Sequence, residues 1–115
     1  MLMASLELTV AVEHRLPVTF LVLNDHSYGM VRHGQRLSGA ESIACELPPI
    51  AFHEVARACG AAGIRVQDLH ELELVPEIYS SDDTAGPCLI DAIIDRDAVP
   101  PMAERVRALS NGRPR

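Results

Sequence analysis

The sequence predicts an α/β protein whose partial, doubly wound and mainly parallel sheet has helices on both faces. Three apolar runs of strand length, at 18–23, 63–66 and 88–94, alternate with segments whose apolar residues recur at helical spacing. This alternation indicates right-handed crossovers between parallel strands. The 115 residues have room for one domain. Three strands leave two sheet edges unpaired, which indicates part of a larger domain or a sheet covered by a partner.

The first two elements are a helix over 5–15 and a strand over 18–23. The helix carries its apolar residues on one stripe, and Ser5 is a suitable N-cap. The strand is a nearly unbroken apolar run that stops at Asn24-Asp25. A run without polar alternation predicts a strand that is buried on both faces, as in parallel sheets.

The remaining elements follow from the same patterns together with the positions of Gly and Pro. Gly34 is expected to interrupt a helix at 30–37, and Pro76 to end or kink a helix at 68–79. The other predictions are a loop at 38–49, a helix at 50–62, the strands at 63–66 and 88–94, a turn at 82–87, a short helix after residue 99 and a disordered tail at 110–115.

Charge and composition exclude several classes of function. The formal net charge is −6, so no overall positive field would attract nucleic acid or an anionic membrane surface. The absence of Lys excludes Schiff-base chemistry and a Walker-type phosphate lysine. No apolar run reaches the roughly 20 residues of a membrane helix, and the start lacks a basic leader, so a cytoplasmic location is expected. Three widely spaced cysteines indicate reduced, buried thiols.

The loop at 24–29 is the main candidate for chemistry. It is rich in turn-forming residues and follows the first strand, and ligands bind at the carboxyl ends of strands in open α/β sheets. If the loop curls, the Asp25 side chain and the Ser27 carbonyl can converge on one hard cation such as Mg²⁺, as two of its six oxygen ligands. The alternative is an Asx-turn, in which Asn24 or Asp25 hydrogen-bonds its own backbone. Composition alone favours the Asx-turn.

Seven short motifs follow one another along nearly the whole chain. They are Glu7-Leu8, Arg15-Leu16-Pro17-Val18, Leu23-Asn24-Asp25, Tyr28-Gly29-Met30-Val31, Gly63-Ile64-Arg65-Val66, Gly86-Pro87-Cys88-Leu89-Ile90-Asp91 and Val99-Pro100-Pro101-Met102. In order and spacing this succession resembles the C-terminal, diphosphate-binding domain of thiamine diphosphate (ThDP) enzymes. Among these enzymes it is most similar to the large subunits of acetolactate synthases.

The resemblance implies a fold, two cofactors and a set of binding residues. Residues 1–109 would form the C-terminal part of a ThDP-binding domain, with ThDP and Mg²⁺ as cofactors. Asp25 corresponds to the side-chain metal ligand of the family and Ser27 to its carbonyl ligand. The residues implied for cofactor binding are Asn24, Ser27, Tyr28, Gly29 and Met30.

Two parts of the family's site are expected outside this chain. A Gly-Asp-Gly motif, which grips the other side of the Mg²⁺ ion, would lie upstream of residue 1, and the Glu that activates the cofactor belongs to a separate domain. The chain is therefore expected to supply half of the Mg²⁺–diphosphate site of an enzyme that decarboxylates a 2-oxo acid and passes the product to a carbonyl acceptor. Alone it is expected to hold no catalytic residue, to be inactive, and to need the other domains or a second copy. The alternative is a non-catalytic α/β interaction module derived from such an enzyme.

Other polar residues have a functional and a structural interpretation. Arg32 and Arg36 are four residues apart and form either a clamp for a 2-oxo acid or a solvated helix face. His26 lies in the candidate loop, where it either hydrogen-bonds a substrate carboxylate or is solvated. Asp91 is expected at a strand end, and His53 shows no clustering that would indicate a metal site.

Overall fold

The computed structural model describes residues 5–80 and 86–98. The elements are α1 (Ser5–Glu13), β1 (Thr19–Asn24), α2 (Gly29–Leu37), α3 (Phe52–Ala58), β2 (Ala62–Val66), α4 (Leu69–Ser80) and β3 (Cys88–Ile93). Most of the turn predicted at 82–87, the short helix predicted after residue 99, the boundary at residue 109 and the tail at 110–115 lie outside the described residues.

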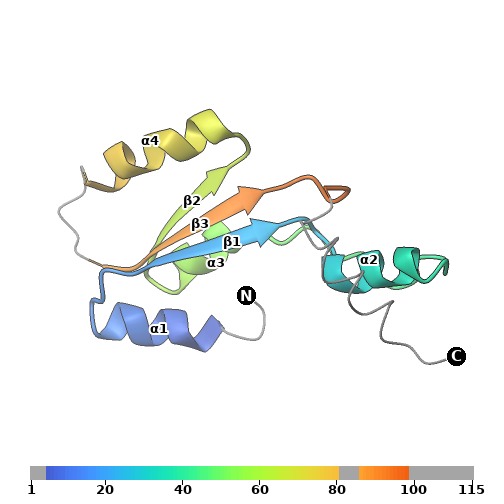
Figure 1. Cartoon of the computed structure of the whole chain (residues 1–115). Helices are drawn as coiled ribbons and strands as arrows, with labels where there is room; N and C mark the ends of the chain where they lie inside the picture. Colours follow the sequence, from blue (N-terminus) through green and yellow to red (C-terminus); the bar gives the residue numbers. More distant parts are fainter. Residues whose placement is uncertain (1–4, 81–85, 99–115) are drawn as a thin grey trace, which may run out of the picture.

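The three strands form one parallel sheet in the order β1-β3-β2 (Figure 1). Cys88 in the central strand β3 pairs with Thr19 of β1 and with Ala62 of β2. The last strand in sequence therefore lies between the two earlier ones, and all three carboxyl ends meet at one edge. The predicted α/β class with a parallel sheet is confirmed.

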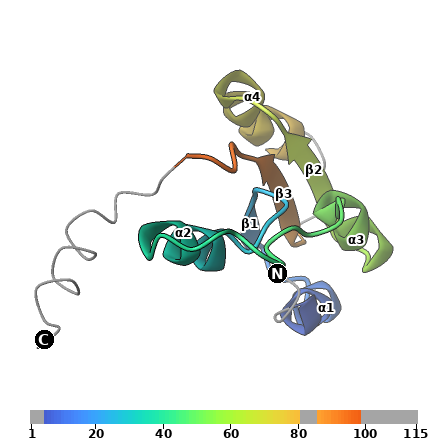
Figure 2. The ribbon, with the colours of Figure 1, turned by 90° about the vertical axis from the view of Figure 1, so that its right-hand side faces the viewer.

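The helices form layers on both faces of the sheet, as predicted (Figure 2). On one face, α1 and α3 pack against the sheet around the completely buried Leu8 and Leu89. On the other face, Val75 of α4 packs against Cys88 and Ile90. Successive side chains of a strand point to opposite faces, so β3 supplies both cores from neighbouring positions. Helix α2 lies apart, beyond the carboxyl end of β1.

The prediction that the first strand is buried on both faces is wrong for the described residues. Phe20 and Val22 are half-buried against the α1 and α3 layer. Leu21 and Leu23 are 56% and 63% exposed on the other face. The reason is that the core cluster under α4 takes its strand residues from β2 and β3, so the α4 side of β1 is left open.

Three helices differ from their predictions near a glycine or a proline. Helix α2 runs through Gly34, because an exposed helical glycine costs only about 1 kcal/mol relative to alanine. Helix α3 ends at Ala58, before Gly60 takes a φ of +89° that favours glycine and stops a helix. Helix α4 spans Leu69–Ser80, close to the predicted 68–79. It continues past Pro76, so of the two predicted effects of Pro76, an end or a kink, the end is wrong.

The sequence also predicts reduced, buried cysteines and no membrane helix. All three cysteines are free; Cys45 and Cys88 are buried and Cys59 is half-buried. Burial raises the pKa of the Cys88 thiol. Within residues 5–80 and 86–98, no helix combines the length and apolar character that a transmembrane span requires.

Candidate functional site

The loop at 24–29 connects β1 to α2 at the carboxyl edge of the parallel sheet (Figure 1). Its backbone is held from the other side by the loop before α3. The Tyr28 N–H donates to the Cys45 carbonyl at 2.8 Å, and the Leu47 N–H donates to the His26 carbonyl at 2.9 Å. The loop is thus a fixed turn at the edge where open α/β sheets bind ligands.

The Asp25 carboxylate folds back onto its own loop. The Ser27 N–H donates to Asp25 Oδ1 at 3.0 Å, and the Ser27 hydroxyl donates to Asp25 Oδ2 at 2.8 Å. The His26 N–H donates to Asn24 Oδ1 at 3.2 Å. The Asx-turn considered in the sequence analysis is therefore confirmed. Since a carboxylate has about four lone-pair sites, these two bonds leave acceptor capacity on Asp25 for a cation.

The neighbourhood of the Asp25 carboxylate fits an oxygen-ligand site for a cation. A Cβ at Gly29 would lie 2.6 Å from Asp25 Oδ2, so the carboxylate occupies space that only glycine leaves open. In the part of the chain that the structure describes, no hydrogen bond occupies the Ser27 carbonyl. One carboxylate and one uncommitted carbonyl are ligands of the kind that Mg²⁺ takes from proteins.

Helix α2 begins directly after this carboxylate without a side-chain cap. Its N-cap residue, Tyr28, makes no cap hydrogen bond within the described chain. The first N–H groups of the helix are therefore available to an anion, in line with the positive end of the helix dipole. Tyr28 is 52% exposed and Met30 63% exposed, which leaves both side chains accessible at the start of α2.

Asn24 has a different position from the other predicted cofactor residues. Its side chain is buried and donates from Nδ2 to Asp91 Oδ1 at 2.9 Å and to the Ile50 carbonyl at 3.1 Å. The structure therefore groups Asp25, Ser27 and Gly29, and directs the Asn24 side chain into the fold. A contact between Asn24 and a cofactor stays a prediction, as do those of Ser27, Tyr28, Gly29 and Met30.

The predicted arginine clamp on α2 binds a side chain of this chain instead. Arg32 is buried, and its guanidinium donates to the Arg96 carbonyl and to Asp97 Oδ1, both at 2.6 Å. Arg36 donates to the same Asp97 oxygen at 3.0 Å. The hydrogen bonds from Arg32 and then Arg36 hold the pKa of Asp97 below its ordinary value. The solvated-face interpretation is wrong for Arg32, whose partners come from the segment after β3.

A buried polar network that the sequence analysis missed lies behind the loop. Asp91 is 1% exposed and lies within β3, not at a strand end. Asp91 Oδ2 is 3.0 Å from Nδ1 of His53, and Asp91 Oδ1 accepts the bond from Asn24. Burial by itself raises the pKa of Asp91, but the hydrogen bonds from His53 and Asn24 lower this pKa overall. The sequence feature that could have indicated this network is the carboxylate of Asp91 inside an otherwise apolar strand.

Comparison with known protein families shows which family this sequence belongs to. The sequence model of the thiamine pyrophosphate enzymes' C-terminal TPP binding domain matches residues 1–92. The chain belongs to this family. Thiamine pyrophosphate (TPP) is another name for ThDP, so the family predicted from the motifs is confirmed.

Three relatives show how far the similarity of this TPP-binding domain extends. It is 28% identical to the putative thiamine pyrophosphate-containing protein YdaP of Bacillus subtilis over 100 aligned residues, and this alignment covers 87% of the chain. It is 30% identical to the acetolactate synthase of Bacillus subtilis over 94 aligned residues, and this alignment covers 82% of the chain. It is 35% identical to the mitochondrial acetolactate synthase catalytic subunit of Saccharomyces cerevisiae over 92 aligned residues, and this alignment covers 78% of the chain.

The TPP-binding domain corresponds to a small part of each relative. The matched regions make up 17%, 16% and 13% of the lengths of these three proteins. Among the residues that the structure describes, no group of three or more His, Cys, Asp and Glu side chains is placed to hold a metal ion.

Proposed function

We propose that the chain supplies half of the Mg²⁺–diphosphate site of a ThDP-dependent enzyme of the acetolactate synthase type. The Asp25 carboxylate and the Ser27 carbonyl bind the Mg²⁺ ion, which in turn binds the diphosphate of the cofactor. The enzyme decarboxylates a 2-oxo acid and transfers the product to a carbonyl acceptor. The other domains, or a second copy of the chain, complete the site.

The observation that carries this proposal is the arrangement of two oxygens beside an uncapped helix. The Asp25 carboxylate fills the space above Gly29, the Ser27 carbonyl is free of hydrogen bonds from described residues, and α2 begins at Gly29. A divalent cation bound by the carboxylate makes it favourable to bring an anionic diphosphate close to Asp25. The helix N-terminus adds N–H donors for the phosphate oxygens.

Each residue of the loop has a defined task in this function. Ser27 fixes the Asp25 carboxylate with two hydrogen bonds, so its orientation does not depend on the metal. Gly29 leaves room for that orientation. Asn24 ties the loop to β3 through Asp91. The bound ThDP supplies the carbanion chemistry needed for decarboxylation, and the role of this chain is to bind and position its diphosphate end.

Paramagnetic Mn²⁺ provides a direct test, because it prefers the same oxygen ligands as Mg²⁺. In NMR spectra of the 115-residue chain with ThDP, Mn²⁺ should broaden the amide signals of residues 25–30 first. Asp25→Ala should abolish this selective broadening, whereas Asp25→Asn should keep part of it because the amide retains one oxygen ligand. Glu73→Ala removes one negative charge from an exposed position on α4 and is the matched control. Equal broadening in Asp25→Ala and Glu73→Ala would contradict the proposed site.

The second candidate function is the non-catalytic interaction module, and the open face of β1 favours it. Leu21 and Leu23 line an apolar groove of about 270 Å³ together with Leu69, Leu72 and Ile94. Exposed apolar surface beside an unpaired strand edge is typical of a surface that another chain covers. Size-exclusion chromatography of the isolated chain tests it: association with a second copy or a full-length relative supports the module, and a sharp monomer peak contradicts it.

A further inference from the structure

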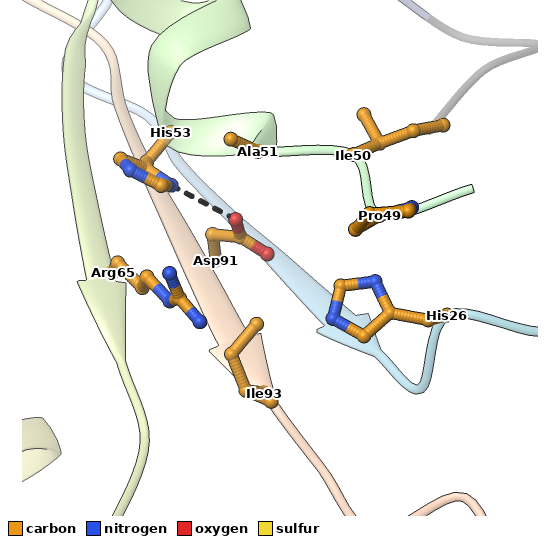
Figure 3. A pocket seen from close by; sticks show the side chains of 8 residues that line it. All are labelled: His26, Pro49, Ile50, Ala51, His53, Arg65, Asp91 and Ile93. Carbon is orange, nitrogen blue, oxygen red and sulfur yellow. Dashed lines mark hydrogen bonds and ion pairs between the residues drawn. The ribbon is translucent and has the colours of Figure 1, made fainter. Parts of the chain in front are cut away.

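A second, smaller cavity lies next to the candidate loop, between its His26 and the first residues of α3 (Figure 3). Its volume is about 110 Å³. It is lined by His26, Pro49, Ile50, Ala51, His53, Arg65, Asp91 and Ile93. Neither Asp25 nor Ser27 lines this cavity, so it is separate from the proposed Mg²⁺ site.

His26 has an unusual backbone and an unpaired polar atom. Its φ is +52°, a region that non-glycine residues rarely adopt. Its Nδ1 is buried and has no hydrogen-bond partner among the described residues. In Figure 3 the imidazole of His26 points into the cavity. Backbone strain together with an unpaired buried nitrogen is typical of a residue that is held in place for a ligand.

His53 faces the same cavity from α3 with one nitrogen already used. Because Asp91 accepts at Oδ2, 3.0 Å away, His53 Nδ1 carries the hydrogen of that bond. The other nitrogen, Nε2, is 3.4 Å from Glu54 Oε1, on a side chain that is 58% exposed. The Asp91 carboxylate already accepts hydrogen bonds from Asn24 and His53, so two of its lone-pair sites are occupied inside the protein.

Arg65 adds an exposed guanidinium to the lining of the cavity. It projects from β2 beside His53 and Asp91 in Figure 3. Within residues 5–80 and 86–98, it forms no ion pair and its side chain makes no hydrogen bond. A guanidinium has donors arranged to bind a carboxylate through two parallel hydrogen bonds. The polar side of the cavity therefore offers donors, and the opposite side is formed by the hydrocarbon of Ile50 and Ile93.

From this arrangement we infer that the cavity binds a small aliphatic monocarboxylate. The carboxylate lies toward Arg65 and the His26 imidazole, and the alkyl group lies against Ile50 and Ile93. Since one water occupies about 30 Å³, the volume has room for roughly three or four waters, or for an acid of about two to four carbons. A doubly charged anion would bring its second charge close to the Asp91 carboxylate, which lines the same cavity. This inference does not depend on the proposed ThDP function.

Titration of the 115-residue chain with sodium acetate and sodium propionate, followed by NMR, tests this site. The side-chain signals of His26 and His53 and the methyl signals of Ile50 and Ile93 should shift and saturate. Sodium chloride at the same ionic strength should cause no saturable shift. Arg65→Gln should raise the apparent Kd by roughly tenfold, because one charged hydrogen-bond donor is lost.

The control variant for Arg65→Gln removes one arginine charge at a position far from the cavity. Arg15→Gln changes an exposed arginine before β1, at the opposite end of that strand, and should leave the acetate affinity unchanged. A linear shift without saturation, an equal response to chloride, or the same affinity in Arg65→Gln and the unchanged chain would each overturn the assignment. The Mn²⁺ measurement reports on residues 25–30 independently, so failure of one site is distinguishable from failure of the other.

Discussion

The side chain of Asn24 donates a hydrogen bond to the buried carboxylate of Asp91 at 2.9 Å and thereby joins the end of β1 to the middle of β3. The two residues are 67 positions apart in the chain. The same Asn24 amide also reaches the Ile50 carbonyl ahead of α3. The loop at 24–29 therefore has its first residue fixed to two other parts of the fold.

The first prediction concerns the stability that this bond provides. Asn24→Ala leaves Asp91 Oδ1 buried without its donor, so the free energy of unfolding should fall by about 1–3 kcal/mol. Urea unfolding followed by circular dichroism measures the change. Gln67→Ala is the control. Gln67 is exposed, its backbone N–H donates to Glu71, and its side chain makes no hydrogen bond to the described residues, so its effect should stay within about 0.5 kcal/mol. Equal losses in the two variants would contradict the role of the Asn24 side chain.

The second prediction is a dependence of stability on pH. The folded-state pKa of Asp91 lies below its unfolded value of about 3.9, so the unfolded chain binds more protons between these two values. The stabilisation from ionised Asp91 is complete above the unfolded pKa and is lost as the pH falls through the folded pKa. The difference in unfolding free energy between the unchanged chain and Asp91→Asn should therefore shrink as the pH is lowered below about 4. A difference that is constant with pH would contradict the lowered pKa.

The third prediction separates metal binding from stability at Gly29. A Cβ here would lie 2.6 Å from Asp25 Oδ2, the mobile end of a side chain, so Gly29→Ala should turn the carboxylate away without unfolding the protein. The selective Mn²⁺ broadening of residues 25–30 should fall. Gly34→Ala is the matched control, since a Cβ at Gly34 meets nothing within 4 Å. It should stabilise α2 by about 0.5–1 kcal/mol and leave the broadening unchanged. Equal broadening in both variants would show that the space above Gly29 does not fix the metal-binding position of the Asp25 carboxylate.

The fourth prediction concerns the segment after β3. Arg32 is buried and binds both the Arg96 carbonyl and Asp97, whereas Arg36 is exposed and binds Asp97 alone. Arg32→Gln should lower the free energy of unfolding by about 1–3 kcal/mol and speed hydrogen exchange of the amides at 97 and 98. Arg36→Gln should change stability by less than about 1 kcal/mol, as for an exposed ion pair. A larger effect of Arg36→Gln would show that the buried guanidinium does not hold this segment.

The order of elements was predictable because its signals are local. Apolar runs of strand length, helical spacing and turn residues lie within a few positions of one another, and they place β1 and β3 to within one residue. The local turn at the candidate loop was predictable for the same reason. The Asx-turn at Asp25 and the oxygens of Ser27 belong to one short loop, and the motifs around it identify the family.

What the sequence did not reveal depends on residues far apart in the chain. His53 and Asp91 are 38 positions apart, and Arg32 and Asp97 are 65 positions apart, so no spacing rule connects them. Whether Leu21 is covered depends on how far α4 reaches across the sheet, which the apolar pattern of β1 does not encode. The second cavity likewise exists only because the loop after β1, the start of α3 and β2 meet at one edge.

The last prediction concerns association through the open face of β1. Leu23 is 63% exposed in the apolar groove, so Leu23→Arg places a charge where a covering chain would have to desolvate it. Size-exclusion chromatography at micromolar concentration should show self-association of the unchanged chain and a shift toward monomer in Leu23→Arg. Leu37→Arg is the control, because Leu37 is 64% exposed at the end of α2, outside the groove. Its elution should match the unchanged chain, since the added charge is the same and only the surface differs. A sharp monomer peak for all three proteins would show that the exposed leucines of β1 do not mediate association.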